Sequence, residues 1–226
     1  MSWFTRALNS SIGKKIVMAL TGVCLILFLI IHLVNNLSLY AGPELFNKVV
    51  KNLDNIKPLI RVVEFILATI LVLHIFNGVK LWIENRMAKS KRYAINASSE
   101  NSNIFSRTMI YSGSIIFIFL TIHLRTLWFY FNFGADYSSL KEHHEYYQIV
   151  KTVFMDPVYS FAYVIAMVLL GFHLNHGFQS AFQTFGWNHK KYFPLIEKIG
   201  LIYSWLTALL FASIPIYFLF FSGGKS

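Results

Sequence analysis

Five long apolar stretches limit what this chain can fold into. They run over Ile16–Leu39, Leu59–Ile83, Met109–Phe133, Val158–Phe182 and Ile199–Phe221. Each is long enough for a helix to cross a hydrocarbon core of roughly 30 Å. The sequence therefore predicts an all-α integral membrane bundle of five transmembrane helices. We expect one domain over residues 1–226, with spans near 14–40, 59–84, 106–132, 157–183 and 198–221.

The composition agrees with a membrane protein, because 56% of the residues are hydrophobic and only 13% are charged. An ordinary soluble domain has about 25% charged residues. We expect no cleaved signal, since the first apolar run is too long and lacks a small-residue cleavage site. The single cysteine, Cys24, excludes an intrachain disulfide and gives too few thiolates for an iron–sulfur cluster. Any such cluster must lie in a partner.

The net charge of +10 does not indicate a nucleic-acid partner, because the basic residues gather at alternate helix ends. With the N-terminus taken as inside, eleven Lys and Arg residues fall on inner segments and five on outer loops. This bias predicts a cytoplasmic N-terminus and an outside C-terminus. Aromatic side chains at the span ends are typical of interfacial belts. They are Tyr40, Trp82, Trp128, Trp187 and Tyr192.

Connections between the spans carry turn signals. Gly42-Pro43 breaks a predicted outer loop over 41–57, and Pro58 suits the first turn of the second span. The polar segment 86–103 is predicted to be a loop on the cytoplasmic side. Residues 141–151 are polar and aromatic enough for a short interfacial helix, before Pro157 opens the fourth span.

Four of the five spans contain a histidine well inside the membrane: His32, His74, His123 and His173. Counting from the helix midpoints places His32 and His123 roughly 6–8 Å outward, and His74 and His173 roughly 4–5 Å inward. Ionisable side chains inside a bilayer are costly and usually functional. The sequence thus predicts two metal centres, one above the other.

Two histidines from two helices fit haem better than other metal sites. Zinc prefers three or four protein ligands, and no carboxylate or thiolate lies near these positions. Haem needs axial ligands alone, and the absence of C-x-x-C-H excludes the usual c-type attachment. We therefore predict two bis-histidine b haems that act as electron carriers. Interhelical hydrogen bonding by the histidines is the structural alternative.

Nearby residues extend the haem prediction. Gly78 and Gly177 each lie one turn after an inner histidine, where a glycine lets a macrocycle approach the backbone, although glycine also serves close helix packing. His176 shares the face of His173 and is predicted to contact a haem propionate or a quinone, or to satisfy a helix contact. The loop histidines, His143, His144 and His189, are expected to be solvated.

Two segments resemble a known family. They are residues 11–22, SIGKKIVMALTG, which lead to His32, and residues 171–186, GFHLNHGFQSAFQTFG. Both are similar to the cytochrome b membrane-anchor subunit of succinate dehydrogenase and fumarate reductase, of the five-helix, dihaem, single-anchor type. The resemblance implies His74 and His173 as ligands of the inner haem and His32 and His123 as ligands of the outer haem, the pairing that depth also gives.

The resemblance further implies a multi-pass subunit in a bacterial cytoplasmic membrane, serving the tricarboxylic acid cycle. A flavoprotein subunit with FAD would act on succinate, and an iron–sulfur subunit would exchange electrons with this chain, which delivers them to quinone, with menaquinone favoured. The chain has no dinucleotide-binding glycine motif and cannot act on succinate by itself. The complex could form a higher oligomer.

A quinone site near the outer haem is expected in this family. The polar residues available there are Asn35, Asn36, Arg61, Glu64, Arg125 and Trp128. Glu64 is the best proton carrier, unless it forms a salt bridge with Arg61 three residues away. Arg125 is an alternative partner for a haem propionate. An inner quinone site could instead use Gln179, Ser180 and Gln183.

Two other functions stay open. The chain could be a dihaem quinone-reactive subunit of a hydrogenase or formate dehydrogenase. It could also be a haem-free transporter or structural anchor whose histidines line a polar pathway.

Overall fold

The computed structural model describes residues 3–88, 104–133 and 145–222, and these residues form helices and short connections without a strand. The long helices are α2 (Ser11–Leu37), α4 (Lys57–Ala88), α6 (Ile104–His123), α10 (Pro157–Thr184) and α11 (Phe193–Phe221). Short α1 (Trp3–Asn9) precedes α2, and a π-helical turn, η2 (Leu124–Trp128), joins α6 to α7 (Phe129–Phe133). Five segments are long and apolar enough to cross a membrane, as the sequence predicts.

Local signals in the sequence explain where several of these helices begin. The Ser10 side chain accepts a hydrogen bond from the Gly13 N–H at 3.0 Å and caps α2. Asp156 caps α10 in the same way, accepting from the N–H groups of Val158 at 2.8 Å and Tyr159 at 3.1 Å. Such caps satisfy N–H groups that have no partner inside the helix.

The connection after α2 corrects one expectation. A loop was predicted over 41–57, but the chain forms a 3-10 turn, η1 (Ser38–Ala41), and then a helix, α3 (Pro43–Asn55). Gly42 adopts φ +92°, which turns the chain sharply, and Pro43 then sits in the first turn of α3. Phe46 is buried, so α3 packs against the rest of the protein through the face that carries this residue.

The predicted interfacial helix is present as α9 (Tyr146–Phe154). It begins later than expected and extends past Lys151, while residues 141–144 lie outside the described residues. Two of the loop histidines predicted to be solvated, His143 and His144, also fall outside them. The cytoplasmic loop predicted over 86–103 begins later than expected, because α4 continues to Ala88, and residues 89–103 lie outside the described residues.

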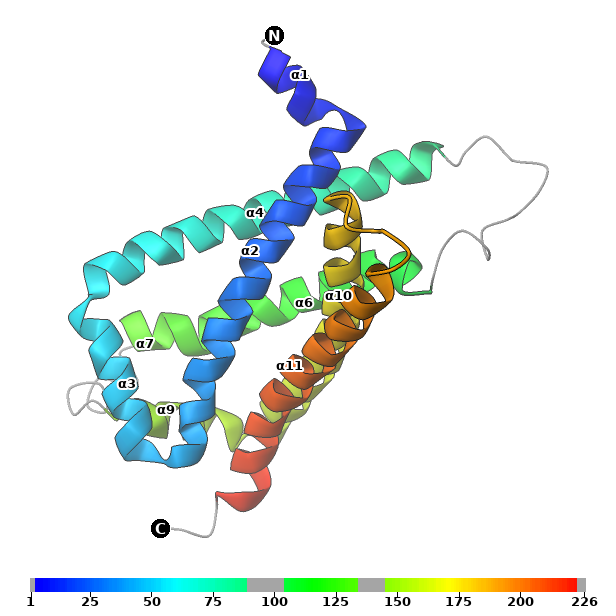
Figure 1. Cartoon of the computed structure of the whole chain (residues 1–226). Coiled ribbons are helices and arrows are strands. Elements are labelled where there is room, and N and C mark those ends of the chain that lie inside the picture. The colour runs from blue at the N-terminus through cyan, green and yellow to red at the C-terminus, as the bar shows by residue number, and fades with distance from the viewer. Residues whose placement is uncertain (1–2, 89–103, 134–144, 223–226) are drawn as a thin grey trace.

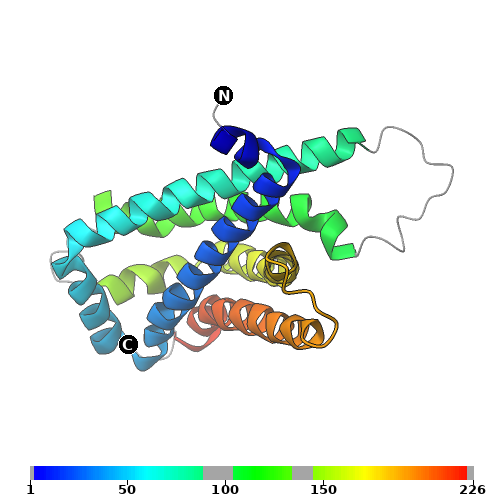
Figure 2. The ribbon, with the colours of Figure 1, turned by 45° about the horizontal axis from the view of Figure 1, so that its top comes forward.

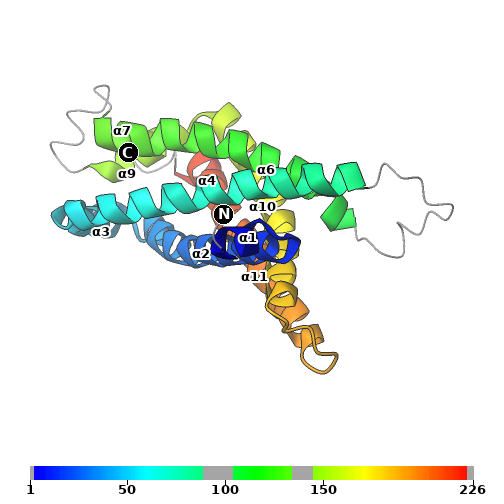
Figure 3. The same ribbon diagram turned by 90° about the horizontal axis from the view of Figure 1, so that it is seen from above.

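Some of the long helices cross one another, and others lie side by side. Figure 1 shows α4 crossing α2 and α6 crossing α10, with α11 beside α10. The turned view in Figure 2 keeps α10 and α11 together, and α2 packs against α4, α10 and α11. Viewed from above, α4 and the α6–α7 segment extend in nearly the same direction (Figure 3). The histidine-bearing helices therefore meet in pairs at their crossings.

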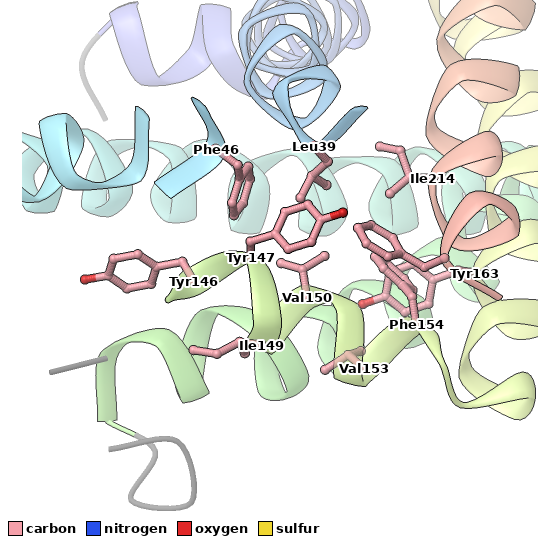
Figure 4. Packing of buried hydrophobic residues seen from close by; sticks show 11 residues of the cluster. Leu39, Phe46, Tyr146, Tyr147, Ile149, Val150, Val153, Phe154, Tyr163 and Ile214 are labelled. Atoms are coloured by element: carbon pink, nitrogen blue, oxygen red, sulfur yellow. The ribbon is translucent and has the colours of Figure 1, made fainter. Parts of the chain in front are cut away.

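At one end of the molecule, α3 and α9 cover the helix ends with a buried aromatic and aliphatic cluster (Figure 4). Tyr147, Phe154 and Tyr163 lie in this cluster, together with Leu39 of η1 and Phe218 of α11. The α9 backbone is tied to α3 by a 2.8 Å hydrogen bond from the Tyr147 N–H to Asn47 Oδ1. Because Phe154 packs on Tyr163 with ring centres 4.9 Å apart, this cluster also supports a residue of the site described below.

Polar contacts hold the beginning of α2 against the last turns of α4. Lys14 forms an ion pair with Glu84, and Asn77 Nδ2 donates to the Lys14 carbonyl at 2.6 Å. Asn77 is buried, so this bond satisfies a polar group that would otherwise be costly inside the protein. The first turns of α2 therefore pack against the last turns of α4.

Candidate cofactor-binding site: two histidine pairs

The four membrane histidines lie in two pairs, each formed across two helices. His74 of α4 and His173 of α10 have ring centres 6.5 Å apart at an interplanar angle of 67°, and we call them the inner pair. His32 of α2 and His123 of α6 have ring centres 6.0 Å apart at 89°, and we call them the outer pair. The names follow the predicted depths, and the structure brings together the same partners that depth predicts.

The spacing within each pair fits one metal ion between two imidazoles. At a metal–nitrogen bond of about 2 Å, two imidazoles that bind from opposite sides have ring centres roughly 6 Å apart. The observed 6.0 and 6.5 Å match this separation. Among the described residues, no three His, Cys, Asp or Glu side chains gather as a metal site would require. A cofactor that needs two axial ligands, such as haem, therefore suits this donor set.

Hydroxyl groups contact both imidazoles of the inner pair. Thr21 Oγ1 of α2 lies 3.0 Å from Nδ1 of His74. Ser112 Oγ of α6 lies 3.3 Å from Nδ1 of His173. A metal-binding histidine commonly uses its second ring nitrogen in this way, which fixes the ring and leaves the first nitrogen for the metal.

Glycines also contact the inner imidazoles. A Cβ added to Gly22 would lie 3.5 Å from His74 Cε1, and one added to Gly113 would lie 3.4 Å from His173 Cε1. These two glycines follow Thr21 and Ser112 directly in the sequence. The sequence analysis did not place these glycines in the site. Each hydroxyl residue before them precedes an outer histidine by eleven residues: Thr21 precedes His32, and Ser112 precedes His123.

The two glycines predicted from the sequence to lie beside a haem, Gly78 and Gly177, have different surroundings. A Cβ on Gly78 would lie 3.3 Å from Met18 Cε, so this glycine gives room to a side chain of α2. A Cβ on Gly177 would meet no protein atom within 4 Å. Gly177 thus has open space beside it, whereas Gly78 serves the packing of α2 on α4.

Aromatic side chains surround the outer pair. His32 stacks on Phe28 with ring centres 5.2 Å apart and lies 5.7 Å from Phe211. His123 packs on Phe119, and its Nδ1 lies 3.1 Å from the Tyr163 hydroxyl. The surroundings are apolar with one hydroxyl, which suits a buried, low-dielectric site.

The turn after His123 changes the direction in which the following side chains of the helix point. The π turn η2 begins at Leu124, and turns of this kind are frequent at functional sites. Its wider geometry changes the helix phase, so that His123 faces Tyr163 while Trp128 faces Glu64 of α4. Arg125 in this turn stacks on Phe129 and Tyr130, at 4.7 and 4.8 Å from the ring centres.

A polar cluster lies where α4 begins. Glu64 Oε2 accepts from Arg61 Nη1 at 2.6 Å, and Glu64 Oε1 accepts from Trp128 Nε1 at 2.8 Å. Arg61 Nη2 donates to Asn132 Oδ1 at 2.6 Å, which adds a residue that the sequence analysis missed. The salt bridge considered from the sequence is therefore present, and both oxygens of Glu64 have a donor.

This polar cluster lines a cavity of about 150 Å³. Its walls include Arg61, Glu64, Trp128, Asn132 and Tyr146. Typical small-molecule pockets are about 300–1,000 Å³, so the cavity has room for a ring-sized head group rather than a whole lipid-like molecule.

The remaining polar residues proposed from the sequence lie elsewhere. Asn35 and Asn36 end α2 and do not line this cavity; Asn36 Nδ2 donates to the His32 carbonyl at 2.8 Å. Gln179 Nε2 donates to Asn175 Oδ1 at 3.0 Å within α10. His176 is half-buried one turn after His173. The structure thus groups Arg61, Glu64 and Trp128, and separates the other residues from them.

These features define a multi-pass helical membrane protein with two cross-helix histidine pairs at its centre. Residues 15–102 match the family described as the succinate dehydrogenase/fumarate reductase transmembrane subunit. The match covers less than half of the chain, includes His32 and His74, one member of each pair, and supports the prediction of a membrane-anchor subunit of this kind of complex. No curated protein and no solved structure matches the chain.

Proposed function

We propose that this chain is the cytochrome b subunit that passes electrons between the iron–sulfur subunit of a succinate:quinone oxidoreductase and membrane quinone. In this proposal the inner pair, His74 and His173, ligates one haem b, and the outer pair, His32 and His123, ligates another. The observation that carries the proposal is the spacing of 6.5 and 6.0 Å between the paired imidazoles. The assignment to this kind of complex rests on the match of residues 15–102.

Bound haem b supplies one-electron redox chemistry. The chain's own contribution would be to supply two imidazoles for each haem iron, His74 with His173 and His32 with His123, which would suit an electron carrier. Phe28, Phe119 and Phe211 keep water from the outer pair. With a single cysteine and no dinucleotide motif, the chain leaves the iron–sulfur clusters and the FAD chemistry to its two partner subunits.

The quinone head group is proposed to bind in the cavity beside Arg61, Glu64 and Trp128. Reduction of a quinone to a quinol takes up two protons with two electrons, and the cavity wall has two carboxylates, Asp54 and Glu64. Asp54 pairs with Lys57 at the start of α4. Glu64, further along α4 beside Arg61 and Trp128, is therefore the proposed proton carrier. Glu64 Oε2 is held by Arg61, so a proton taken up at this oxygen requires Arg61 to release it. Asn35 and Asn36 are not part of this proposed site.

Three further residues were predicted to lie near a haem: Gly177, His176 and Arg125. Their positions support this role unequally. Gly177 leaves space beside the inner pair, and His176 lies one turn from His173. Arg125 would have to leave its aromatic partners to reach a propionate. Menaquinone is the proposed acceptor or donor, and a bacterial cytoplasmic membrane, with the N-terminus inside, is the proposed location.

The test is a count of haems in the purified membrane complex. A pyridine haemochrome assay and a dithionite-reduced minus oxidised spectrum should give two b haems per copy of the chain. One haem would mean that one histidine pair has a structural role. A haem-free complex would return the chain to the transporter or anchor class, and a covalent flavin with succinate–dye activity would separate this complex from a hydrogenase or formate dehydrogenase.

A further inference from the structure

A hydroxyl followed by a glycine meets each imidazole of the inner pair in the same way. Thr21-Gly22 of α2 contacts His74, and Ser112-Gly113 of α6 contacts His173. Both hydroxyl residues are buried, at 8% and 6% exposure. The glycine admits the ring, and the hydroxyl beside it meets Nδ1.

Each hydroxyl has a backbone carbonyl of its own helix as an acceptor beside its contact with the imidazole. Thr21 Oγ1 donates its one proton to its own helix, with the Val17 carbonyl at 2.8 Å. Ser112 Oγ likewise donates to the Met109 carbonyl at 3.1 Å. A hydroxyl has one proton and two lone pairs, so an oxygen that donates to its helix carbonyl can accept only from Nδ1–H of its histidine. In that arrangement each inner imidazole carries its proton on Nδ1 and a lone pair on Nε2.

The two units occupy the same register on their helices. His32 follows Thr21 by eleven residues, and His123 follows Ser112 by eleven residues. Eleven residues make about three turns, so the hydroxyl and the outer histidine share one helix face. Each of α2 and α6 therefore presents a ligand of the outer pair and a hydroxyl for the inner pair on one face.

We propose that Thr21 and Ser112 are positioning residues for the inner haem ligands, a role that rests on the proposed function. Each hydroxyl holds its imidazole in the Nδ1–H tautomer and turns Nε2 towards the metal position. An imidazole whose N–H is hydrogen-bonded is a more basic ligand. A more basic ligand stabilises the oxidised iron, so both hydroxyls lower the midpoint potential of the inner haem.

The experiment uses the whole complex with Thr21→Val, Ser112→Ala and the double variant. Thr21→Ser keeps the hydroxyl, and the matched controls are Thr121→Val and Ser114→Ala on α6, whose hydroxyls donate to the carbonyls of Phe117 and Ile110. Redox titration followed at the haem bands gives the midpoint potentials, and electron paramagnetic resonance reports the axial ligand field. A His74→Ala complex, which keeps the outer haem, assigns the two titration waves.

We expect the inner wave to move to higher potential in both single variants and further in the double variant. The outer wave, Thr21→Ser and both controls should match the unmodified complex. If a variant fails to retain both haems, selective loss of the inner haem relative to the controls supports the role.

Three results would overturn the proposal. They are an unshifted inner wave in the double variant, an equal shift in Thr21→Ser and Thr21→Val, and equal loss of both haems in a folded variant. A complex without two haems before any substitution would instead refute the proposed function, so the two failures are distinguishable.

Discussion

Each imidazole of the inner pair faces one partner, so removing it should affect one centre. We expect His173→Ala to reduce the haem content of the complex from two to one, because alanine has no group to bind iron and His74 alone supplies one axial ligand. The pyridine haemochrome assay measures the ratio. His189→Ala, in the turn before α11, is the control that should keep two haems.

The same substitution also tests the pairing. The remaining haem in His173→Ala should have the midpoint potential of the outer centre and should match the haem that remains in His74→Ala. Loss of both haems from a complex that still contains all its subunits would contradict the assignment of His173 to one centre.

The carboxylate of Glu64 gives a second prediction for a single residue. Glu64→Gln keeps an oxygen for the Trp128 N–H but cannot carry a proton or pair with Arg61 as an anion. General acid–base groups contribute about 10²–10⁴-fold to a rate. We therefore expect quinone turnover to fall at least tenfold, while succinate oxidation with a soluble dye stays unchanged.

Glu197→Gln on α11 is the matched control for the quinone assay. It neutralises one carboxylate outside the cavity and should leave both activities unchanged. Equal quinone turnover in Glu64→Gln and Glu197→Gln would move the quinone site away from the polar cluster.

The residues of the site differed in how well the sequence predicted them. His32, His74, His123 and His173 could be found because an imidazole is rare in a span and its depth follows from counting residues. Thr21 and Ser112 could not, since serine and threonine in a membrane helix usually bond their own backbone. Their contacts with histidines depend on which helices cross, which sequence spacing within one helix does not determine.

At the level of whole elements, one glycine on α11 and one on α10 have environments that predict opposite results on substitution. A Cβ on Gly200 of α11 would lie 2.6 Å from Phe178 Cδ1 of α10, and Phe178 is held by Phe182 with ring centres 4.7 Å apart. Gly200→Ala should therefore push α10 and α11 apart and cost about 1–3 kcal/mol. Thermal unfolding in detergent, followed by circular dichroism, measures the loss.

Gly177→Ala is the counterpart within α10. The protein offers no atom within 4 Å of the added methyl group, and alanine favours a helix over glycine by about 0.5–1 kcal/mol. If a haem lies beside Gly177, the variant should lose inner haem while the haem-free protein is no less stable. Unchanged haem content would place the cofactor away from this glycine.

The helices themselves were largely predictable, and the exceptions have a physical reason. Long apolar runs determined five spans because a helix must satisfy its own backbone in lipid. The helix α3 was missed because Gly42-Pro43 and the polar residues of the segment indicated a loop, although its apolar residues recur at helical spacing: Leu45, Phe46, Val49, Val50 and Leu53. It forms because Phe46 has a buried place against Tyr147 of α9, a contact between segments far apart in the chain.

For the whole molecule, an odd number of spans predicts that the two ends of the chain lie on opposite sides of the membrane. The bias of the basic residues predicts that the segment between α10 and α11, with Lys190 and Lys191, lies in the cytoplasm. Ser222, at the end of α11, should then lie outside. Both positions are exposed or half-buried at helix ends, so a cysteine at either can meet a water-soluble reagent.

Labelling with a membrane-impermeant maleimide tests this orientation in intact cells. The single native cysteine is first replaced by Cys24→Ser, since Cys24 is exposed on the helix surface. Ser222→Cys should react from outside, and Lys190→Cys should react only after the membrane is permeabilised. The reverse pattern would invert the molecule, place the inner pair on the outer side and turn the proposed quinone cavity towards the cytoplasm.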